Sequence, residues 1–552
     1  MKTDIQIAQE CTMEPIIDIA KKAGITQEYI IPFGNDKAKV NLEVLKKINN
    51  EGKLILVTAI NPTKAGEGKS TTTVGLVDGL AKIGKKVIGA LREPSLGPVF
   101  GIKGGATGGG FAQAVPMESI NLHFTGDMHA ITTVNNLISA IIDNQLFLGN
   151  NLNIDPERIV WKRCMDMNDR SLREIEIAQG NKNGIPRKDG FNITVASEVM
   201  AILCLSDSLD DFEERIKRIV VAYSKDGKEI TVEDLGVSGA LKVLMKDAIM
   251  PNLVQTLENN PILIHGGPFA NIAHGCNSVI ATKMALGLAD YVVTEAGFGA
   301  DLGAEKFVDI KCRSAKFNLD AVVVVATIRA LKMHGGCEYD KLKEENVELL
   351  EKGMDNLRKH IETISQFNVP FVVALNKFST DTESEISYLK QWCENEGYSY
   401  SLCEGWEKGG DGMVELANTV VALTEQKHQL SYIYDTNLSL EEKILTIVQK
   451  VYGGKEVEYT ENAREQLKEF KERGWDQYPI CMAKTPLSLS DDPKKIGRPK
   501  DFVLTVRELR ISAGAGFVVV LTGAVMTMPG LPKQPAAYNM GVDDEGNTYG
   551  IF

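Results

Sequence analysis

A β-branched run followed by a glycine-rich loop and a helix-forming stretch most constrains what this chain can fold into. Residues 54–60 have the pattern of a buried strand, residues 61–68 contain closely spaced glycines, and residues 69–83 favour a helix. Short apolar strands that alternate with helices are typical of a parallel sheet covered on both faces. The same alternation recurs after further apolar runs at residues 86–91, 261–265, 291–294, 321–326 and 371–375. The sequence therefore predicts an α/β protein with a P-loop NTPase-like, mostly parallel sheet as its core.

The loop after the first strand has the residues expected of a phosphate-binding loop. Gly66 and Gly68 let backbone N–H groups converge on phosphate oxygens, and the following helix adds partial positive charge at its N-terminus. Lys69 would neutralise the outer phosphates, and the hydroxyl of Ser70 or Thr71 is suited to Mg²⁺. The order of strand, glycines and helix is the context that such a motif requires. We therefore predict an MgATP site formed by Thr63, Gly66, Glu67, Gly68, Lys69, Ser70 and Thr71.

The loop departs from the strict GxxxxGK[ST] motif, because Thr63 stands at the first glycine position. It matches the shorter pattern GxGK[ST], which is less specific. Lys64, five residues before Lys69, also fits the variant loop KxGxGK[ST] of partitioning and nitrogenase-type ATPases. Two alternatives therefore stay open: a nucleotide-switched partner protein of that type, and a structural strand-to-helix turn with a surface lysine.

The second predicted strand leads into charged residues and then into a glycine run. Arg92 and Glu93 follow the strand, and residues 101–110 contain six glycines together with Lys103. Because ligands of parallel α/β sheets bind beyond the carboxyl ends of the strands, we expect Arg92 and Glu93 beside the phosphate loop. A backbone so rich in glycine cannot pack a core, so the run is either a mobile linker or a surface that approaches a ligand closely. Lys103 favours an anion-binding surface.

Acidic and aromatic residues follow the predicted strand at residues 291–294. Glu295 and Asp301 carry the oxygen ligands that Mg²⁺ prefers, and we predict a metal site from Ser70 and Glu295. Phe298 is placed to cover a nucleotide base, so we add it to the ATP-binding residues.

Basic side chains cluster after the predicted strand at residues 321–326. They are Arg329, Lys332 and His334. An anion-binding role and an ordinary solvated helix start are equally compatible with this pattern.

Two aromatic residues lie on loops that follow later strands. Phe378 comes directly after Asn376 and Lys377, and Trp406 lies in a glycine-containing loop further along the chain. A guanine-specific NKxD motif is excluded, because Asp381 lies two positions too late. We predict that Phe378 and Trp406 hold a flat ring between them; the alternative is that each is a core or lid aromatic.

The length of 552 residues exceeds one typical core and predicts several domains. Between residues 155 and 257 the sequence becomes charged and rich in helix formers, which indicates an inserted α/β domain. We place a nucleotide-binding domain at residues 1–130 plus 288–343, the inserted helix-rich α/β domain at 131–287, and a C-terminal α/β domain, which contributes the Phe378 and Trp406 site, at 344–552.

Composition narrows the possible partners and the compartment. A formal net charge of −13 argues against nucleic-acid or anionic-membrane partners. Nine cysteines without a CxxC pair predict reduced thiols and no zinc or redox motif. No apolar stretch reaches the roughly 20 residues that span a bilayer, and no signal peptide is recognisable. We therefore expect a cytoplasmic protein without membrane or nucleic-acid partners.

Taken together, these motifs resemble the formate–tetrahydrofolate ligase family, also called formyltetrahydrofolate synthetases, along essentially the full length. The resemblance rests on three segments: TAINPTKAGEGKSTTT at residues 58–73, LREPSLGPVFGIKGGATGGG at 91–110 and VATIRALKMHGG at 325–336. It implies that formate attacks the γ-phosphate of MgATP to give formyl phosphate, and that the amine of tetrahydrofolate then attacks the formyl carbon. The products would be 10-formyltetrahydrofolate, ADP and phosphate.

The resemblance also implies roles for individual residues. Lys69 matches the phosphate lysine and Arg92 the arginine that binds the acyl phosphate, and we add Glu93 to them as catalytic residues. Phe378 and Trp406 match the aromatics beside the folate pterin. Family resemblance further implies a homotetramer and activation by a monovalent cation, K⁺ or NH₄⁺. A non-enzymatic folate carrier would explain the two aromatics but not Lys69.

Overall fold

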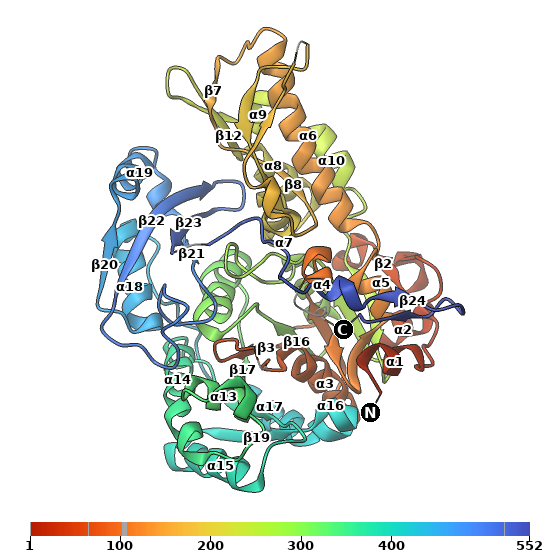
Figure 1. Ribbon diagram of the computed structural model, residues 1–552. Coiled ribbons are helices and arrows are strands. Elements are labelled where there is room, and N and C mark those ends of the chain that lie inside the picture. The colour runs from red at the N-terminus through yellow and green to blue at the C-terminus, as the bar shows by residue number, and fades with distance from the viewer. Residues whose placement is uncertain (1, 65, 102–106, 181, 524, 552) are drawn as a thin grey trace.

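The computed structural model describes residues 2–64, 66–101, 107–180, 182–523 and 525–551. Its centre is a 12-stranded sheet whose main path runs in the order β1-β2-β14-β15-β4-β16-β3-β17-β18-β19 (Figure 1). From β15 to β19 all neighbours are parallel. The strands of the main path are β1 (Ile30–Pro32), β2 (Ala38–Val40), β14 (Asn252–Thr256), β15 (Pro261–Ile264), β4 (Val87–Leu91), β16 (Tyr291–Glu295), β3 (Lys53–Ala59), β17 (Ala321–Ala326), β18 (Phe371–Asn376) and β19 (Ser399–Cys403).

All six strands predicted from apolar runs are present within one or two residues of their predicted ends, so the α/β class is confirmed. Two further strands of the sheet, β14 and β19, escaped prediction because their sequences NLVQT and SYSLC mix polar and apolar residues. Off the main path, β5 (Gly108–Gly109) pairs with β6 (Ala112–Val115), which also pairs with β14.

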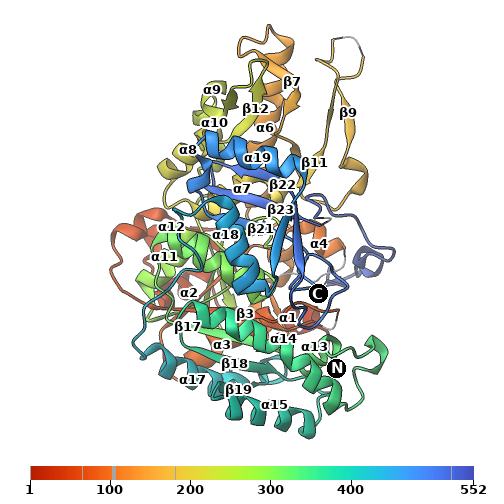
Figure 2. The same ribbon diagram turned by 90° about the vertical axis from the view of Figure 1, so that its left-hand side faces the viewer.

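Helices cover both faces of the parallel strands. Alternate residues of β3 point to opposite faces, so Ile55 and Val57 pack with α3 (Lys69–Lys82) and α17 (Val414–Thr424). Leu54 and Leu56 belong to the cluster on the other face, which contains α11 (Val279–Leu288) and α14 (Val347–Gln366). Figure 2 shows α14 and α17 on opposite sides of β18. This three-layer packing buries β4, β16 and β17 completely and leaves the carboxyl ends of the parallel strands at one edge of the sheet.

A second group of elements projects from the central sheet (yellow in Figure 1). Its three-stranded sheet has the order β13-β12-β7 and packs with a core of apolar helix residues. The elements are α6 (Asp127–Phe147), β7 (Ile154–Ile159), α7 (Glu198–Leu205), α8 (Leu209–Lys217), β12 (Val220–Ser224), β13 (Glu229–Thr231), α9 (Val232–Leu235) and α10 (Ser238–Met245). Two short pairs, β8 (Arg163–Met165) with β11 (Phe191–Ile193) and β9 (Ile175–Ile177) with β10 (Arg187–Asp189), complete it.

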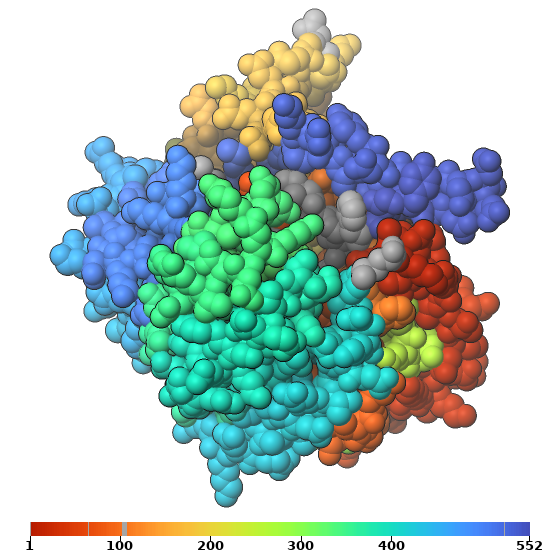
Figure 3. All heavy atoms as spheres, turned by 60° about the horizontal axis from the view of Figure 1, so that its bottom comes forward, coloured from red at the N-terminus to blue at the C-terminus, as the bar shows by residue number. Residues whose placement is uncertain are grey.

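The last part of the chain forms a four-stranded sheet, β20-β22-β23-β21, and then returns to the N-terminus (blue in Figure 1). On this return Ala536 N–H donates to the Gly101 oxygen (2.8 Å), and Ile551 packs with Ile5. The elements are α18 (Leu440–Ile447), β20 (Glu456–Tyr459), α19 (Glu461–Glu472), β21 (Ile480–Ala483), β22 (Val503–Ser512) and β23 (Phe517–Thr522). Figure 3 shows the N-terminal, middle and C-terminal parts of the chain meeting on one face.

The central sheet takes strands from all three proposed domains. Strands β14 and β15 come from residues 131–287, and β18 and β19 come from residues 344–552. Strand pairing joins segments that are far apart in the sequence, whereas the proposed limits follow changes of composition along it. The limits themselves stay predictions. Among the described residues, no helix combines the length and the apolar character needed to cross a membrane.

Candidate active site

The glycine loop joins β3 to α3 at the carboxyl edge of the parallel sheet. Its backbone takes positive φ at Gly66 (76°) and Gly68 (68°), a conformation that glycine adopts without steric cost. The Thr63 N–H donates to Glu67 Oε1 (2.5 Å), and the Gly66 N–H donates to the Thr63 oxygen (3.2 Å). Thr63 and Glu67 thus close a tight turn, and Gly68 becomes the N-cap of α3.

Lys69 and Ser70 begin α3 and contact the end of β16. Lys69 Nζ donates to the backbone oxygens of Ala296 (2.5 Å) and Phe298 (3.1 Å). Ser70 Oγ donates to Glu295 Oε2 (3.0 Å), and Arg92 Nη2 lies 3.5 Å from Glu295 Oε1. Four of the predicted residues therefore converge at the ends of β4 and β16 and the start of α3.

Phe298 lies in a strained turn directly after β16. Its φ of 59° is a conformation that residues with a Cβ seldom adopt, and such strain clusters at functional sites. The turn is also tight, because a Cβ atom at Gly297 would lie 2.9 Å from Arg92 Nη1. This segment is therefore shaped around Arg92 and Lys69.

Glu93, the third predicted catalytic residue, belongs to a different set of contacts. Its side chain is buried, and burial together with the nearby Asp127 carboxylate raises its pKa well above the ordinary value. Asp127 forms a buried ion pair with Lys39 (2.7 Å) and accepts a hydrogen bond from Asn252 Nδ2 (2.8 Å). Glu93 thus lies within the influence of Asp127 and Lys39, and its catalytic role stays a prediction.

Three further residues named in the sequence analysis form buried contacts within the protein: Asp301, Lys332 and His334. Asp301 Oδ2 lies 2.8 Å from Lys484 Nζ, and Lys332 Nζ lies 2.7 Å from Glu385 Oε1, both pairs being fully or almost fully buried. His334 Nε2 lies 3.0 Å from the backbone oxygen of Asn61.

Of the two aromatics predicted to hold a flat ring on loops, Phe378 does lie in the loop after β18, but Trp406 lies in the short helix α16 (Gly405–Lys408) after β19. Phe378 and Trp406 follow β18 and β19, whose last residues Asn376 and Cys403 are paired. An ion pair between Lys377 and Glu404 (3.1 Å) links the loop after β18 to the N-cap of α16. Asp381 Oδ2 accepts from the Phe378 N–H (2.8 Å), so the aspartate stabilises this loop.

Arg329 and the glycine run contact the two aromatics at the carboxyl edge of the sheet. The Arg329 guanidinium lies 4.8 Å from the Phe378 ring centroid, so one face of that ring is covered. The Phe111 N–H donates to the Trp406 oxygen (2.8 Å), and a Cβ at Gly110 would lie 2.1 Å from that oxygen. The described part of the run thus approaches Trp406 closely. Lys103 lies outside the described residues.

Sequence reasoning missed two residues that shape the glycine loop. Asn376 lies against Gly68, and Asn61, at the loop entrance, is fully buried in a network of hydrogen bonds. Asn61 is the polar residue at the end of an apolar strand, and Asn376 ends another. Both are polar residues at the carboxyl end of an apolar run, and this position could have identified them from the sequence.

The residues that could hold a metal ion are oxygen donors. Among the described residues, no group of three or more His, Cys, Asp or Glu side chains is arranged to bind a metal. The Ser70 hydroxyl and the buried Glu295 carboxylate fit Mg²⁺, which takes few protein ligands and completes its shell with phosphate oxygens and water.

The fold and the site together define an α/β protein with a glycine loop between a central parallel strand and a helix, surrounded by a lysine, an arginine and a carboxylate. A family model described as "Formate--tetrahydrofolate ligase" matches residues 2–552. The chain therefore belongs to the formate–tetrahydrofolate ligase family and is an enzyme of one-carbon metabolism. This assignment favours a ligase over a nucleotide-switched partner protein or a non-enzymatic folate carrier.

Proposed function

We propose that the chain activates formate with ATP bound at the glycine loop, and that formyl phosphate is the intermediate that formylates tetrahydrofolate. The observation that carries this proposal is the convergence of Lys69, Ser70 and Arg92 on the end of β16. Formate and ATP are both anions, so bringing a formate oxygen to the γ-phosphorus requires concentrated positive charge. Lys69 and Arg92 supply that charge at the carboxyl edge of the sheet.

The two steps balance without a covalent enzyme intermediate. A formate oxygen forms a bond to the γ-phosphorus while the bond to the ADP oxygen breaks. The folate amine then attacks the formyl carbon and loses a proton, and phosphate leaves with the oxygen that came from formate. Arg92 would bind the acyl phosphate through its planar fork of donors.

Glu295 and Ser70 would hold Mg²⁺ beside the loop. The ion, when bound, would neutralise part of the charge on the β- and γ-phosphates. Glu295 is fully buried and contacts Ser70 and Arg92, so its carboxylate has a fixed position from which it would coordinate the ion.

Phe378, in the loop after β18, and Trp406, in the short helix after β19, would bind the pterin. Because Arg329 covers one face of the Phe378 ring, the pterin would use the other face or the ring edge. Asn376 connects the two sites, since it ends the strand that leads to Phe378 and lies against Gly68.

Isotope transfer tests the intermediate directly. Formate labelled with ¹⁸O should give inorganic phosphate that carries one labelled oxygen per turnover, measured by mass spectrometry in the presence of ATP, Mg²⁺ and tetrahydrofolate. Lys69→Ala protein is the control and should release no labelled phosphate. Product formation without label in the phosphate would refute the formyl phosphate route.

A further inference from the structure

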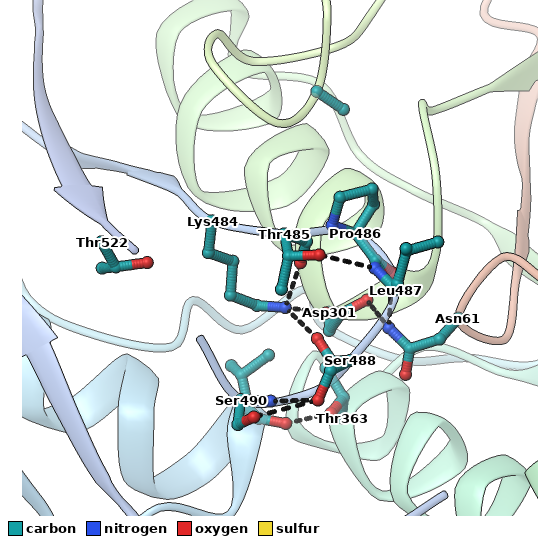
Figure 4. Close-up of polar contacts among 12 residues, drawn as sticks. Asn61, Asp301, Thr363, Lys484, Thr485, Pro486, Leu487, Ser488, Ser490 and Thr522 are labelled. Atoms are coloured by element: carbon teal, nitrogen blue, oxygen red, sulfur yellow. Dashed lines mark hydrogen bonds and ion pairs between the residues drawn. The ribbon is translucent and has the colours of Figure 1, made fainter. Parts of the chain in front are cut away.

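A lysine from the C-terminal part of the chain is buried beneath the entrance of the glycine loop. Lys484 directly follows β21, its side chain is fully buried, and its Nζ lies 2.8 Å from Asp301 Oδ2 (Figure 4). Lys484 also donates to the backbone oxygens of Thr485 (3.0 Å) and Ser488 (2.5 Å). One ion pair and two hydrogen bonds therefore hold the lysine in one position.

Asp301 also contacts Asn61, the first residue of the glycine loop. Its Oδ1 accepts a hydrogen bond from Asn61 Nδ2 (3.2 Å), and the same Nδ2 donates to the Pro486 oxygen (3.1 Å). Figure 4 shows Asn61, Asp301 and Lys484 converging from three separate segments. Since Asn61 comes two residues after the end of β3, the direction in which the glycine loop leaves the sheet depends on this side chain.

The backbone of Asn61 is fixed as well. Its oxygen lies 3.0 Å from His334 Nε2, while His334 Nδ1 accepts from the Gly497 N–H (3.3 Å). Nε2 must therefore carry the proton and donate to Asn61. Asn356 Nδ2 donates both to Asn61 Oδ1 (3.0 Å) and to the Gly497 oxygen (2.7 Å). The segment from Lys484 to Gly497 thus contacts the loop entrance at several points.

Asp301 also lies close to the turn that receives the phosphate lysine. Lys69 donates to the oxygens of Ala296 and Phe298, and Asp301 is the second residue of the helical turn Ala300–Ala304 just after them. A Cβ at Gly299 would lie 2.8 Å from Asp301 Oδ1, so the carboxylate packs against this turn. Asp301 therefore touches both the start of the glycine loop and the turn to which Lys69 is bonded.

The contacts of Asp301 depend on Lys484, because Lys484 neutralises the buried charge of the Asp301 carboxylate. Asp301 and Lys484 are both fully buried, and within the described parts of the chain no other cation forms an ion pair with Asp301. Burial lowers the pKa of Lys484, and the Asp301 carboxylate opposes that effect. Removing one partner of a buried pair leaves an uncompensated charge, which is far more costly than removing both.

We propose that Lys484 is a positioning residue for the reaction: by neutralising Asp301 it fixes Asn61 and the turn at residues 296–299, and so holds the glycine loop in the shape that binds the nucleotide phosphates. This role rests on the proposed binding of ATP at that loop. Lys484 touches no reacting atom in this arrangement. It acts through Asp301 and Asn61.

Three variants separate the roles of the two charges. Lys484→Met leaves the carboxylate unpaired, and Asp301→Asn leaves the ammonium unpaired but keeps an oxygen that can accept from Asn61. The double variant has no buried charge. Because breaking a buried pair is costly, we expect each single variant to raise the KM for ATP by about tenfold or more, with the KM for tetrahydrofolate within about twofold. The double variant should recover most of the loss.

Lys443→Met is the matched control. Lys443 is also fully buried in the C-terminal part of the chain, but it donates to the backbone oxygens of Asp476 and Tyr478, away from the loop. Its loss should affect stability and leave the ratio of the two KM values unchanged. Equal changes of both KM values in Lys484→Met would overturn the proposal, because they would indicate a general structural defect.

Hydrogen exchange tests the positioning role of Lys484 separately from ATP binding. In the protein without nucleotide, amides of residues 61, 63, 64, 66–68 and 296–303 should exchange faster in Lys484→Met than in wild type or in Lys443→Met. If wild type fails to bind ATP, the proposed function is wrong, but amide exchange still shows whether Lys484 positions the loop. If the single variant does not fold, the double variant takes its place: wild-type exchange in both segments supports the proposal, and fast exchange in a folded double variant contradicts it.

Discussion

Gly68 and Asn376 are in such close contact that a Cβ atom on the glycine would lie 1.9 Å from Asn376 Nδ2. Gly68 is the N-cap of α3 and Asn376 ends β18, so the contact joins the glycine loop to the strand that leads to Phe378. The two predicted substrate sites thus share a wall made of one backbone and one amide side chain.

Gly68→Ala should abolish nucleotide binding and turnover. The methyl group would collide with Asn376, and the positive φ would cost about 1–2 kcal/mol in addition. Isothermal calorimetry with MgATP measures the loss. Gly84→Ala, in the turn after α3, is the control, because Gly84 has a φ of 78° but open space around it. Adding Asn376→Ala to Gly68→Ala should restore part of the affinity, and no restoration would mean that the collision is not the cause.

Arg92→Lys should lower the turnover number strongly while ATP affinity changes little. The substitution keeps a charge but loses the fork that would bind an acyl phosphate, so stabilisation of the transition state falls on the order of 2–4 kcal/mol. Arg358→Lys is the control, since Arg358 pairs in bidentate fashion with Glu396 at the surface. Steady-state kinetics and calorimetry together decide the outcome. If ATP binding weakens as much as turnover, Arg92 serves the nucleotide and the acyl phosphate role fails.

Trp406→Ala should raise the KM for tetrahydrofolate far more than the KM for ATP. Lost stacking is worth on the order of 1 kcal/mol, which corresponds to about a fivefold change. Phe378→Ala should act in the same direction. Trp392→Ala provides the comparison, because Trp392 packs against Tyr398 and Arg358 on the outer helix α15 (Glu383–Glu396). An unchanged folate KM would return Trp406 to a structural role.

Asp78 should make the stability of the fold depend on pH. It is fully buried in α3, accepts from Asn260 Nδ2 (2.7 Å), and has its pKa raised by burial from 3.8 to about 7. Between these values the folded state keeps a proton that the unfolded chain releases, so the free energy of unfolding falls as pH rises through this window.

Asp78→Asn removes this dependence and keeps the acceptor oxygen. Relative to wild type, the variant should gain on the order of 2–4 kcal/mol between pH 4 and pH 8, seen as a growing difference in Tm. Asp544→Asn, at an exposed position, should show no such trend. A Tm difference that stays constant across this range would show that Asp78 remains charged in the folded protein.

The sequence by itself determined the α/β class, the six main strands and the place of the glycine loop. These features depend on local patterns: β-branched runs that must be buried on both faces, and glycines at positions where the backbone turns with positive φ. The same local signals identified Lys69, Ser70, Arg92 and Glu295, because charged residues just after parallel strands gather at one edge of the sheet.

Only the tertiary structure decided which of the candidate residues meet. Glu93 follows the same strand as Arg92 but lies with Asp127, and Asp301 follows the strand that ends at Glu295 but pairs with Lys484. Strand order, and the packing of Lys484 from nearly two hundred residues further along the chain, are set by contacts between distant segments. A buried charge is stable only beside a partner, and no local pattern reveals which distant segment supplies it.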